Sequence, residues 1–214
     1  MAIEAVIWDF GGVFTTSPFE AFNRYEAQRG LPLDLIRTIN ATNPHDNAWA
    51  LFERAEIDAG GFDALFAEEA RVLGHSLRGA EVLPLLSGDV RPRMVEALTA
   101  CKARFKVGCI TNNVQGAGHG AGMASTSAKA AQVAEIMAAF DAVIESSKIG
   151  LRKPDPRIYQ MMCELLDVAP AACVYLDDLG INCKPAAQLG MTAIKVQGED
   201  QALADLARAT GLSF

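Results

Sequence analysis

The sequence has no long basic run, no Cys-x-x-Cys pair and no apolar stretch long enough to cross a bilayer. Its formal net charge of −7 argues against nucleic acid or an anionic membrane surface as a partner. The five cysteines are odd in number, so reduced and mostly buried thiols are expected. The first residues carry no basic segment ahead of an apolar one, and a cytoplasmic protein is therefore expected.

Half of the 214 residues are hydrophobic, which is enough for one large domain or for a core with a subdomain. Residues 5–8 form a short apolar run that ends in one acid, Asp9, followed by Gly11 and Gly12. Such a run is typical of a strand buried on both faces, and glycines allow a sharp turn after it. Taken alone, the stretch fits a ligand-binding strand end and a solvated turn equally well.

Strand-like and helix-like segments alternate in the second half of the chain. The strand-like runs lie at 106–111, 142–145, 172–177 and 192–196. The helical stretches lie at 91–104, 126–140, 156–167 and 183–189. Asp155 with Pro156 marks a helix start, and Gly190 and Gly211 mark helix ends. The alternation predicts an α/β fold: a Rossmann-like parallel sheet with right-handed crossovers.

A helical insert separates the first strand from the rest of the sheet. The pattern predicts helices at 18–29, 33–41, 46–55 and 62–73. Because a strand–helix–strand unit needs only about thirty residues, the surplus is expected to form its own unit. We place the core at 1–14 and 88–214 and the insert at 15–87, where it would cover the sheet edge as a lid or pack elsewhere on the core. Most phenylalanines with helix-like spacing are expected to pack the insert, and one or two to line the entrance: Phe19, Phe22, Phe52, Phe62 and Phe66.

Residues 115–123 alternate glycine with small residues. This stretch superficially resembles a phosphate-cradling loop, but it does not pass directly from strand to helix with the usual glycine spacing. A flexible loop near the site is therefore predicted.

Polar residues stand where the predicted strands end. Because parallel strands finish at one edge of a sheet, these side chains are expected to face a common crevice. They are Asp9, Thr111, Asn112, Lys153, Asp177 and Asp178. Each alone is also explained as part of a turn, a surface charge or a helix cap, but together they are the groups that phosphoryl transfer requires.

An attack by the Asp9 carboxylate on a phosphoryl group needs a divalent cation and fixed donors, because like charges repel. Asp9 and Asp178, with a backbone carbonyl near Gly11, are the candidate ligands of Mg²⁺. Asp177 is expected to orient the surroundings of the metal or the lysine.

Three residues are the candidates for holding the phosphoryl oxygens of a small phosphorylated molecule. They are Thr111, Asn112 and Lys153, which supply a hydroxyl, an amide and a cation. Lys153 is also a candidate catalytic residue with Asp9 and Asp177.

In order and spacing these residues resemble the four motifs of the haloacid dehalogenase (HAD) superfamily of hydrolases. The resemblance implies that Asp9 is the nucleophile, Thr111 the hydroxyl of the second motif and Lys153 the lysine of the third. Asp177 and Asp178 correspond to the acidic fourth motif, in which Asp178 would be the acid on the metal. The insert resembles a cap of the first type.

Three segments are similar, more narrowly, to the N-terminal phosphatase domain of soluble epoxide hydrolases. They lie at 144–150, 153–159 and 175–186. This narrower resemblance implies phosphatase activity with Mg²⁺.

One position departs from that family. HAD phosphatases usually carry a second aspartate two residues after the nucleophile, which protonates the leaving group and activates water, and this chain has Gly11 there. The missing proton transfer is expected to cost about 10²–10⁴-fold in rate, unless a water, Thr15, Thr16 or an insert residue replaces it.

Three functions follow as expectations. The first is a Mg²⁺-dependent phosphatase that acts on a small phosphomonoester through an aspartyl-phosphate at Asp9. The second is hydrolytic dehalogenation of a small halo-acid, in which Asp9 attacks carbon and no metal is needed. The third is a phosphate-ligand binding protein that has lost turnover because of Gly11.

Overall fold

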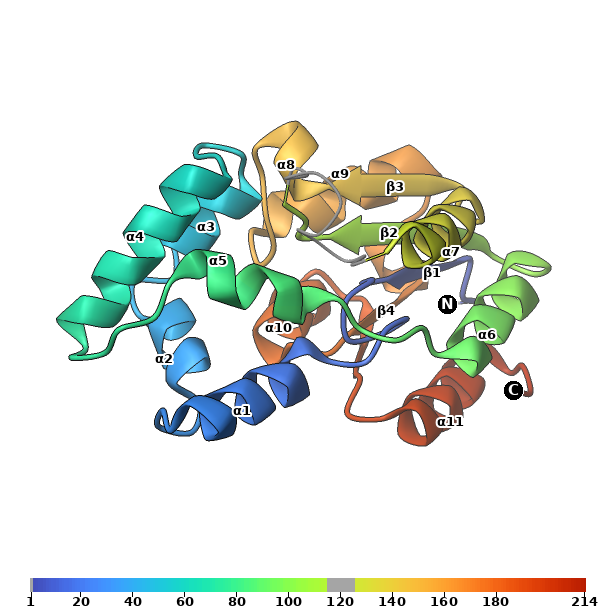
Figure 1. Cartoon of the computed structure of the whole chain (residues 1–214). Helices are drawn as coiled ribbons and strands as arrows, with labels where there is room; N and C mark the ends of the chain where they lie inside the picture. The colour runs from blue at the N-terminus through green and yellow to red at the C-terminus, as the bar shows by residue number, and fades with distance from the viewer. Residues whose placement is uncertain (1, 115–125) are drawn as a thin grey trace.

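The computed structural model describes residues 2–114 and 126–214, so the loop predicted at 115–123 lies outside the described residues. Its centre is a sheet of five parallel strands in the order β3-β2-β1-β4-β5 (Figure 1). The strands are β1 (Ala5–Trp8), β2 (Lys106–Thr111), β3 (Ala142–Glu145), β4 (Cys173–Asp177) and β5 (Thr192–Lys195). This arrangement confirms the predicted α/β fold.

Strand β1 lies in the middle of the sheet and is buried along its whole length. Ala5 pairs with Lys106 on one side and with Cys173 on the other, and the register continues to Trp8. Alternate residues of the strand point to opposite faces. Val6 and Trp8 join one apolar cluster, whereas Ala5 and Ile7 join another. The two-sided burial explains why four consecutive apolar residues precede Asp9.

Helices cover both faces of the sheet. Helices α6 (Pro92–Lys102), α7 (Ser127–Ala138) and α11 (Glu199–Thr210) pack on the face of Val6 and Trp8. Helices α9 (Pro156–Leu166) and α10 (Gly180–Gln188) pack on the face of Ala5 and Ile7. Two short helices, α8 (Ser146–Ile149) and the 3₁₀ turn η2 (Pro170–Ala172), complete the core.

The insert lies beyond the ends toward which the strand arrows point (Figure 1). Its helices are α1 (Pro18–Arg29), α2 (Leu35–Ala41), α3 (Ala48–Glu53), α4 (Ala59–Val72), α5 (Gly79–Val82) and the 3₁₀ turn η1 (Leu83–Leu86). They bury their own apolar cluster, in which the rings of Phe52 and Phe62 stack with centroids 5.0 Å apart. The chain enters and leaves the insert side by side, because Thr15 forms an antiparallel bridge with Val90.

Several element boundaries differ from the sequence prediction. Helix α10 begins at Gly180, three residues before the expected start, with Pro185 inside it. The prediction failed here because proline is more typical of a first turn. Helix α5, η1 and α8 were not predicted, because they span four residues each, too few for a helical period. Helix α5 and η1 are held by packing in the insert, for example that of Val82 and Leu83. The predicted start of α9 is confirmed, since Asp155 accepts a hydrogen bond from the Arg157 N–H at 2.9 Å.

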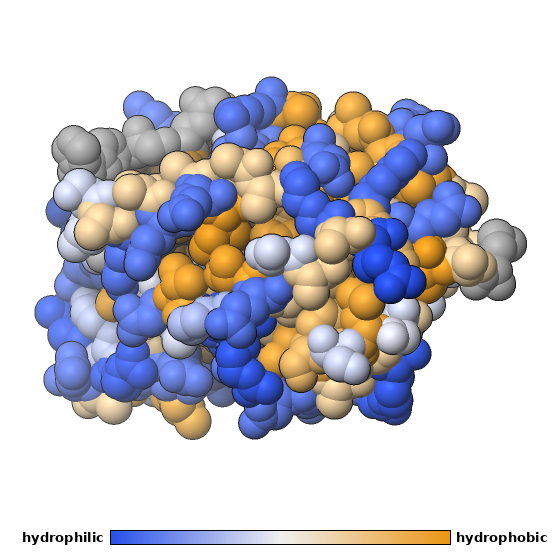
Figure 2. Space-filling model, turned by 90° about the vertical axis from the view of Figure 1, so that its right-hand side faces the viewer, coloured by the Kyte–Doolittle hydropathy of each residue, from blue (hydrophilic) through white to orange (hydrophobic). Residues whose placement is uncertain are grey.

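The expectations from composition concern long apolar segments and the state of the cysteines. No helix in residues 2–114 or 126–214 is both long and apolar enough to cross a membrane. Figure 2, which views the end of the molecule opposite the insert, shows hydrophobic residues interspersed among hydrophilic ones. All five cysteines are buried and free, as expected: Cys101, Cys109, Cys163, Cys173 and Cys183.

Candidate active site

Four predicted residues lie together at the carboxyl edge of the sheet. Asp9 follows β1, Asp177 is the last residue of β4, and Asp178 comes next. One carboxylate oxygen from each of these three lies within 4.8 Å of the others. Lys153, from the loop before α9, places its Nζ 2.7 Å from Asp9 Oδ1 and 2.8 Å from Asp177 Oδ2.

Asp9 is held through its backbone and through one carboxylate oxygen. Its N–H donates to the Leu176 carbonyl at 2.8 Å, which extends the pairing of β1 with β4 beyond the strand. Its Oδ1 accepts from the Phe10 N–H at 2.7 Å and from Lys153. Among the described residues no donor reaches Oδ2, so this oxygen is available to a ligand in the cavity that Asp9 lines.

Asp177 is fully buried, and donors surround its carboxylate. The Tyr175 hydroxyl at 2.6 Å and Lys153 at 2.8 Å donate to Oδ2. The Leu179 N–H donates to Oδ1 at 2.8 Å, and Asn182 Nδ2 lies 3.1 Å from both oxygens. A carboxylate with this many donors has little capacity left for a cation, so the geometry of Asp177 fits the orientation of Lys153.

Tyr175 and Asn182 support the site and were not assigned a role from sequence. The rings of Tyr159 and Tyr175 meet edge to face with centroids 5.2 Å apart, and the Tyr159 hydroxyl donates to the Asn182 carbonyl at 2.8 Å. Tyr175 was detectable, because residues two apart on a strand share a face, and it stands two residues before Asp177. Asn182 depends on the turn that begins α10, for which the sequence has no local signal.

Negative charge exceeds positive charge in this cluster. Burial alone would lower the pKa of Lys153, but Asp177 and Asp9 outweigh burial and hold that pKa above its ordinary range. Burial raises the pKa of Asp9 well above its ordinary value; Lys153 opposes this effect, while Asp177 and Asp178 add to it. Three carboxylates that share one ammonium group thus leave a charge imbalance that a divalent cation would remove.

Asp178 is the carboxylate of the cluster with the fewest partners. Among the described residues, Ser17 is the only one whose side chain lies within hydrogen-bond distance, with its Oγ 3.5 Å from Asp178 Oδ2. Burial first and Asp177 second raise the pKa of Asp178 to about 6, and Lys153 offsets this in part. Oxygen donors with an excess of negative charge suit Mg²⁺. The residues present therefore fit such a cation.

The close approach of Gly12 to Asp178 gives a test of this candidate cation site. Gly12 has φ +73°, and a Cβ added there would lie 2.1 Å from Asp178 Oδ2. Gly12→Ala must therefore displace this carboxylate, and we expect Mg²⁺ affinity to fall about 10–100-fold, measured by isothermal titration calorimetry. The matched control is Gly30→Ala, at φ +65° in the insert, where a Cβ would meet nothing within 4 Å. Equal affinity in the two variants would contradict the assignment of Asp178 to the cation.

Binding of Mg²⁺ should also depend on pH because Asp178 must be ionised to bind it. With its pKa raised from 3.8 to about 6, Asp178 is protonated more as pH falls below that value. The Mg²⁺ affinity should therefore weaken about tenfold between roughly pH 7 and pH 5. Calorimetric titrations across this range measure the slope, and Asp178→Asn, which cannot titrate, should reduce it to the part that Asp9 contributes. A flat profile in the natural protein would contradict the raised pKa.

Thr111 and Asn112 reach the same edge at the end of β2. Thr111 is buried and lines the cavity above the carboxylates. The side chain of Asn112 faces the loop that carries Lys153: its Oδ1 accepts from the Lys153 N–H at 2.9 Å, and its Nδ2 donates to the Lys153 carbonyl at 3.0 Å. The side chain of Asn112 thus holds the lysine loop.

A cavity of about 920 Å³ opens between the insert and the strand ends. Asp9, Gly11 and Asp178 form part of its polar lining. Most of the other walls are apolar and come from both parts of the chain: Phe19, Phe22 and Trp49 from the insert, and Val133, Leu179 and Ile181 from the core. Phe22, Phe52, Phe62 and Phe66 belong to the buried cluster of the insert, and Phe19 packs against it. The expectation that most phenylalanines pack the insert while one or two line the entrance is confirmed.

A parallel sheet with acids and a lysine at its carboxyl edge places the chain among Rossmann-like α/β enzymes. Residues 3–190 match the haloacid dehalogenase-like hydrolase family, and the chain belongs to that family. The resemblance stated from the motifs is therefore confirmed.

Two relatives are similar to this chain over nearly all of its length. The chain is 28% identical over 226 aligned residues to bifunctional epoxide hydrolase 2 of Sus scrofa, and the match covers all of this chain and 40% of that protein. It is 31% identical over 215 residues to phosphatase MT3486 of Mycobacterium tuberculosis, covering 94% of this chain and 90% of the relative. The chain thus spans less than half of the epoxide hydrolase.

A similar solved structure is that of a HAD family enzyme from Bacteroides thetaiotaomicron in complex with magnesium and inorganic phosphate. Its TM-score is 0.61 at 18% identity, and the match covers 93% of this chain and 97% of that one. At this identity the similarity shows the fold.

Proposed function

We propose that this hydrolase is a Mg²⁺-dependent phosphatase that cleaves a phosphomonoester through an aspartyl-phosphate at Asp9. The observation that carries the proposal is the ion-paired Lys153, which contacts both Asp9 and Asp177 beside the poorly partnered Asp178. The names of phosphatase MT3486 and of the Thermotoga maritima phosphorylated carbohydrates phosphatase, 28% identical over 198 residues, support the reaction class.

The residues of this chain divide the chemistry between them. The Asp9 carboxylate attacks phosphorus, the bond from phosphorus to the organic oxygen breaks, and the leaving alcohol takes up a proton from water. Lys153 keeps the Asp9 carboxylate oriented, and with Thr111 it stabilises the phosphoryl oxygens. The Asn112 side chain, expected from the sequence to bind them as well, instead uses its oxygen and its nitrogen to bind the loop of Lys153 and Glu53. Water then attacks phosphorus, the bond to Asp9 breaks, and inorganic phosphate leaves with the carboxylate restored.

Asp9, Asp178 and the Gly11 carbonyl would hold the Mg²⁺. When bound, the cation neutralises charge on the phosphoryl oxygens that would otherwise repel the nucleophile. Lys153 supplies a further positive charge beside Asp9, and Asp177 orients it.

Proton transfer is limited in this scheme because residue 11 is glycine and carries no acid. Thr15 Oγ1 accepts from the Gly12 N–H at 3.3 Å, and Thr16 Oγ1 accepts from the Asp89 N–H at 3.0 Å. Both hydroxyls therefore support the loops between core and insert, and neither ionises near neutral pH. We expect the alcohol to be protonated by water and turnover to be slow.

The side chains that line the cavity indicate which organic group the substrate carries. Aromatic and aliphatic side chains from both the insert and the core face this space, and they favour an apolar organic group over a sugar. The helical insert, as a cap over the strand ends, would enclose that group. We therefore expect alkyl and aryl phosphates to be hydrolysed better than hexose phosphates.

Hydrolytic dehalogenation is the second candidate, because it does not need the acid that Gly11 lacks. The acid pair Asp177 and Asp178 weighs against it, since without a cation these two carboxylates would repel both Asp9 and an anionic halo-acid. Halide release that survives a chelator would favour this candidate over the phosphatase.

The experiment that tests the proposal is phosphate release from a panel of phosphoesters, with Mg²⁺ and with chelator. The panel holds glycerol phosphate, a hexose phosphate, an aryl phosphate and alkyl phosphates of rising chain length. Acetyl phosphate, which is an acyl phosphate rather than an ester, is added because its acetate leaves without an acid. We expect release that requires Mg²⁺ and increases with apolar chain length. Tight Mg²⁺-dependent binding of phosphate mimics, with no release from any ester, would instead identify a binding protein.

A further inference from the structure

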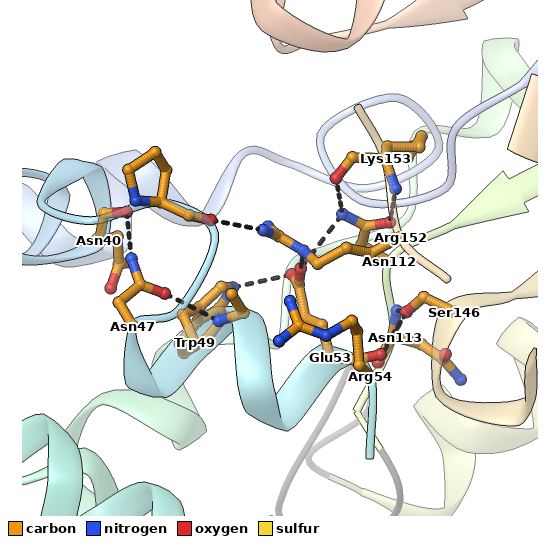
Figure 3. Close-up of polar contacts among 12 residues, drawn as sticks. Asn40, Asn47, Trp49, Glu53, Arg54, Asn112, Asn113, Ser146, Arg152 and Lys153 are labelled. Atoms are coloured by element: carbon orange, nitrogen blue, oxygen red, sulfur yellow. Dashed lines mark hydrogen bonds and ion pairs between the residues drawn. The ribbon is translucent and has the colours of Figure 1, made fainter. Parts of the chain in front are cut away.

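A buried carboxylate joins the insert to the core beside the active site. Glu53 is the last residue of α3, and its side chain is 8% exposed. Its Oε1 accepts from Trp49 Nε1 within the insert at 2.8 Å. Its Oε2 accepts from two core side chains, Arg152 Nε at 2.6 Å and Asn112 Nδ2 at 3.1 Å (Figure 3).

Two further bonds fasten the insert at the same place. The Ser146 hydroxyl, at the start of α8, donates to the Glu53 carbonyl at 2.7 Å. Arg152 Nη1 donates to the Pro44 carbonyl of the insert at 2.9 Å. Arg152 therefore contacts the insert through both Nε and Nη1, and its positive charge balances the negative charge of Glu53.

The contact with Asn112 leads directly to Lys153. Asn112 holds the backbone of Lys153 through both its oxygen and its nitrogen, as described above. The same Nδ2 that donates to the Lys153 carbonyl also donates to Glu53. The orientation of the Asn112 amide, and with it the position of Lys153, is thus set in part by a residue of the insert.

We propose that Glu53 is a positioning residue that makes the placement of Lys153 depend on the docked insert. The inference rests on the proposed function, because Lys153 matters there as the partner of Asp9. Replacing the carboxylate of Glu53 by an amide would leave Arg152 without its counter-ion and put an NH₂ donor where donors now meet an oxygen, which weakens the contact with Asn112. The Asn112 amide would then be held by its two bonds to the Lys153 backbone alone, and the lysine loop would lose its support from the insert.

The first test compares two isosteric substitutions in the insert. Glu53→Gln should lower kcat for acetyl phosphate about 10–100-fold, because misplacement of a reacting group is costly. The control is Glu26→Gln: Glu26 is also buried, but its partners are the N–H groups of Asp34 and Ile36 within the insert. Acetyl phosphate has almost no organic group that the insert could contact. A lower kcat with this substrate therefore points to Lys153. An unchanged kcat in Glu53→Gln would overturn the inference.

A double variant separates positioning from general loosening. If Glu53 acts through Asn112, Glu53→Gln should lower kcat no further in an Asn112→Ala background. Full additivity of the two losses would overturn the inference.

The second test does not depend on turnover. The Lys153 N–H is bonded to Asn112 Oδ1, so hydrogen exchange at this amide reports on the loop. Exchange should be faster in Glu53→Gln than in the natural protein and in Glu26→Gln. If no ester is hydrolysed, the proposed function fails and exchange alone decides the role of Glu53. If exchange is unchanged in an active enzyme, the positioning role fails and the proposed function stands.

Discussion

Replacing Asp9 with asparagine is expected to lower the rate of phosphate release at least about 10³-fold. Asparagine retains an oxygen that accepts from the Phe10 N–H, so the local fold should survive. It lacks the anionic oxygen that attacks phosphorus and a charge that pairs with Lys153. Initial rates of phosphate release with saturating Mg²⁺ measure the effect.

The control for this substitution lies at the other end of the sheet. Asp141 also accepts a backbone hydrogen bond, from the Val107 N–H at 2.8 Å, and pairs with Lys102 at 3.2 Å. Asp141→Asn changes a carboxylate at the amino end of β3 and should retain natural turnover. Equal rates for Asp9→Asn and the natural protein would exclude Asp9 as the nucleophile.

Installing an acid at Gly11 is expected to raise the turnover number about 10²-fold, the lower end of the range for general acid–base catalysis. The position accepts a side chain, because a Cβ built on Gly11 meets nothing within 4 Å and its backbone is outside the left-handed region. The new carboxyl would enter the cavity that Gly11 lines. There it would protonate the leaving alcohol and activate water for the second step.

Gly11→Asn is the matched control for this gain. It has the same shape as the aspartate variant and fills the same space, but it cannot transfer a proton. Only Gly11→Asp should be faster than the natural protein in kcat for an alkyl phosphate. If neither variant is faster, or if both are equally so, the missing acid does not limit this enzyme.

The core of the fold followed from residue patterns because its signals are local. Residues 5–8 are apolar without interruption, and the strand they form is buried between two neighbours. The Asp155 cap and the φ of +73° at Gly211 likewise depend on a few adjacent residues. Helix α5 could not be predicted in this way, because four residues provide no period and its limits are set by packing in the insert.

Only the part of the candidate site that lies at the strand ends could be predicted, because the topology of the sheet places those residues. Once the strands are parallel, Asp9, Asp177 and Asp178 must share an edge, and the structure places them there. The role of Glu53 could not be found in this way, since α3 and the strand ends come together only through the packing of the insert on the core. The sequence has no periodicity or motif that pairs Glu53 with Asn112 or Arg152.

Peptide mapping of the acid-quenched enzyme tests the central claim most directly. The natural protein is mixed with Mg²⁺ and an aryl phosphate, whose phenol leaves without an acid, then quenched during turnover and digested. Because Gly11 leaves the second step without a base, we predict a phosphoryl group on the peptide that contains Asp9. It should be absent in Asp9→Asn and scarce in Gly11→Asp. Release of phosphate by the natural protein with no phosphoryl group on that peptide would contradict an aspartyl-phosphate at Asp9.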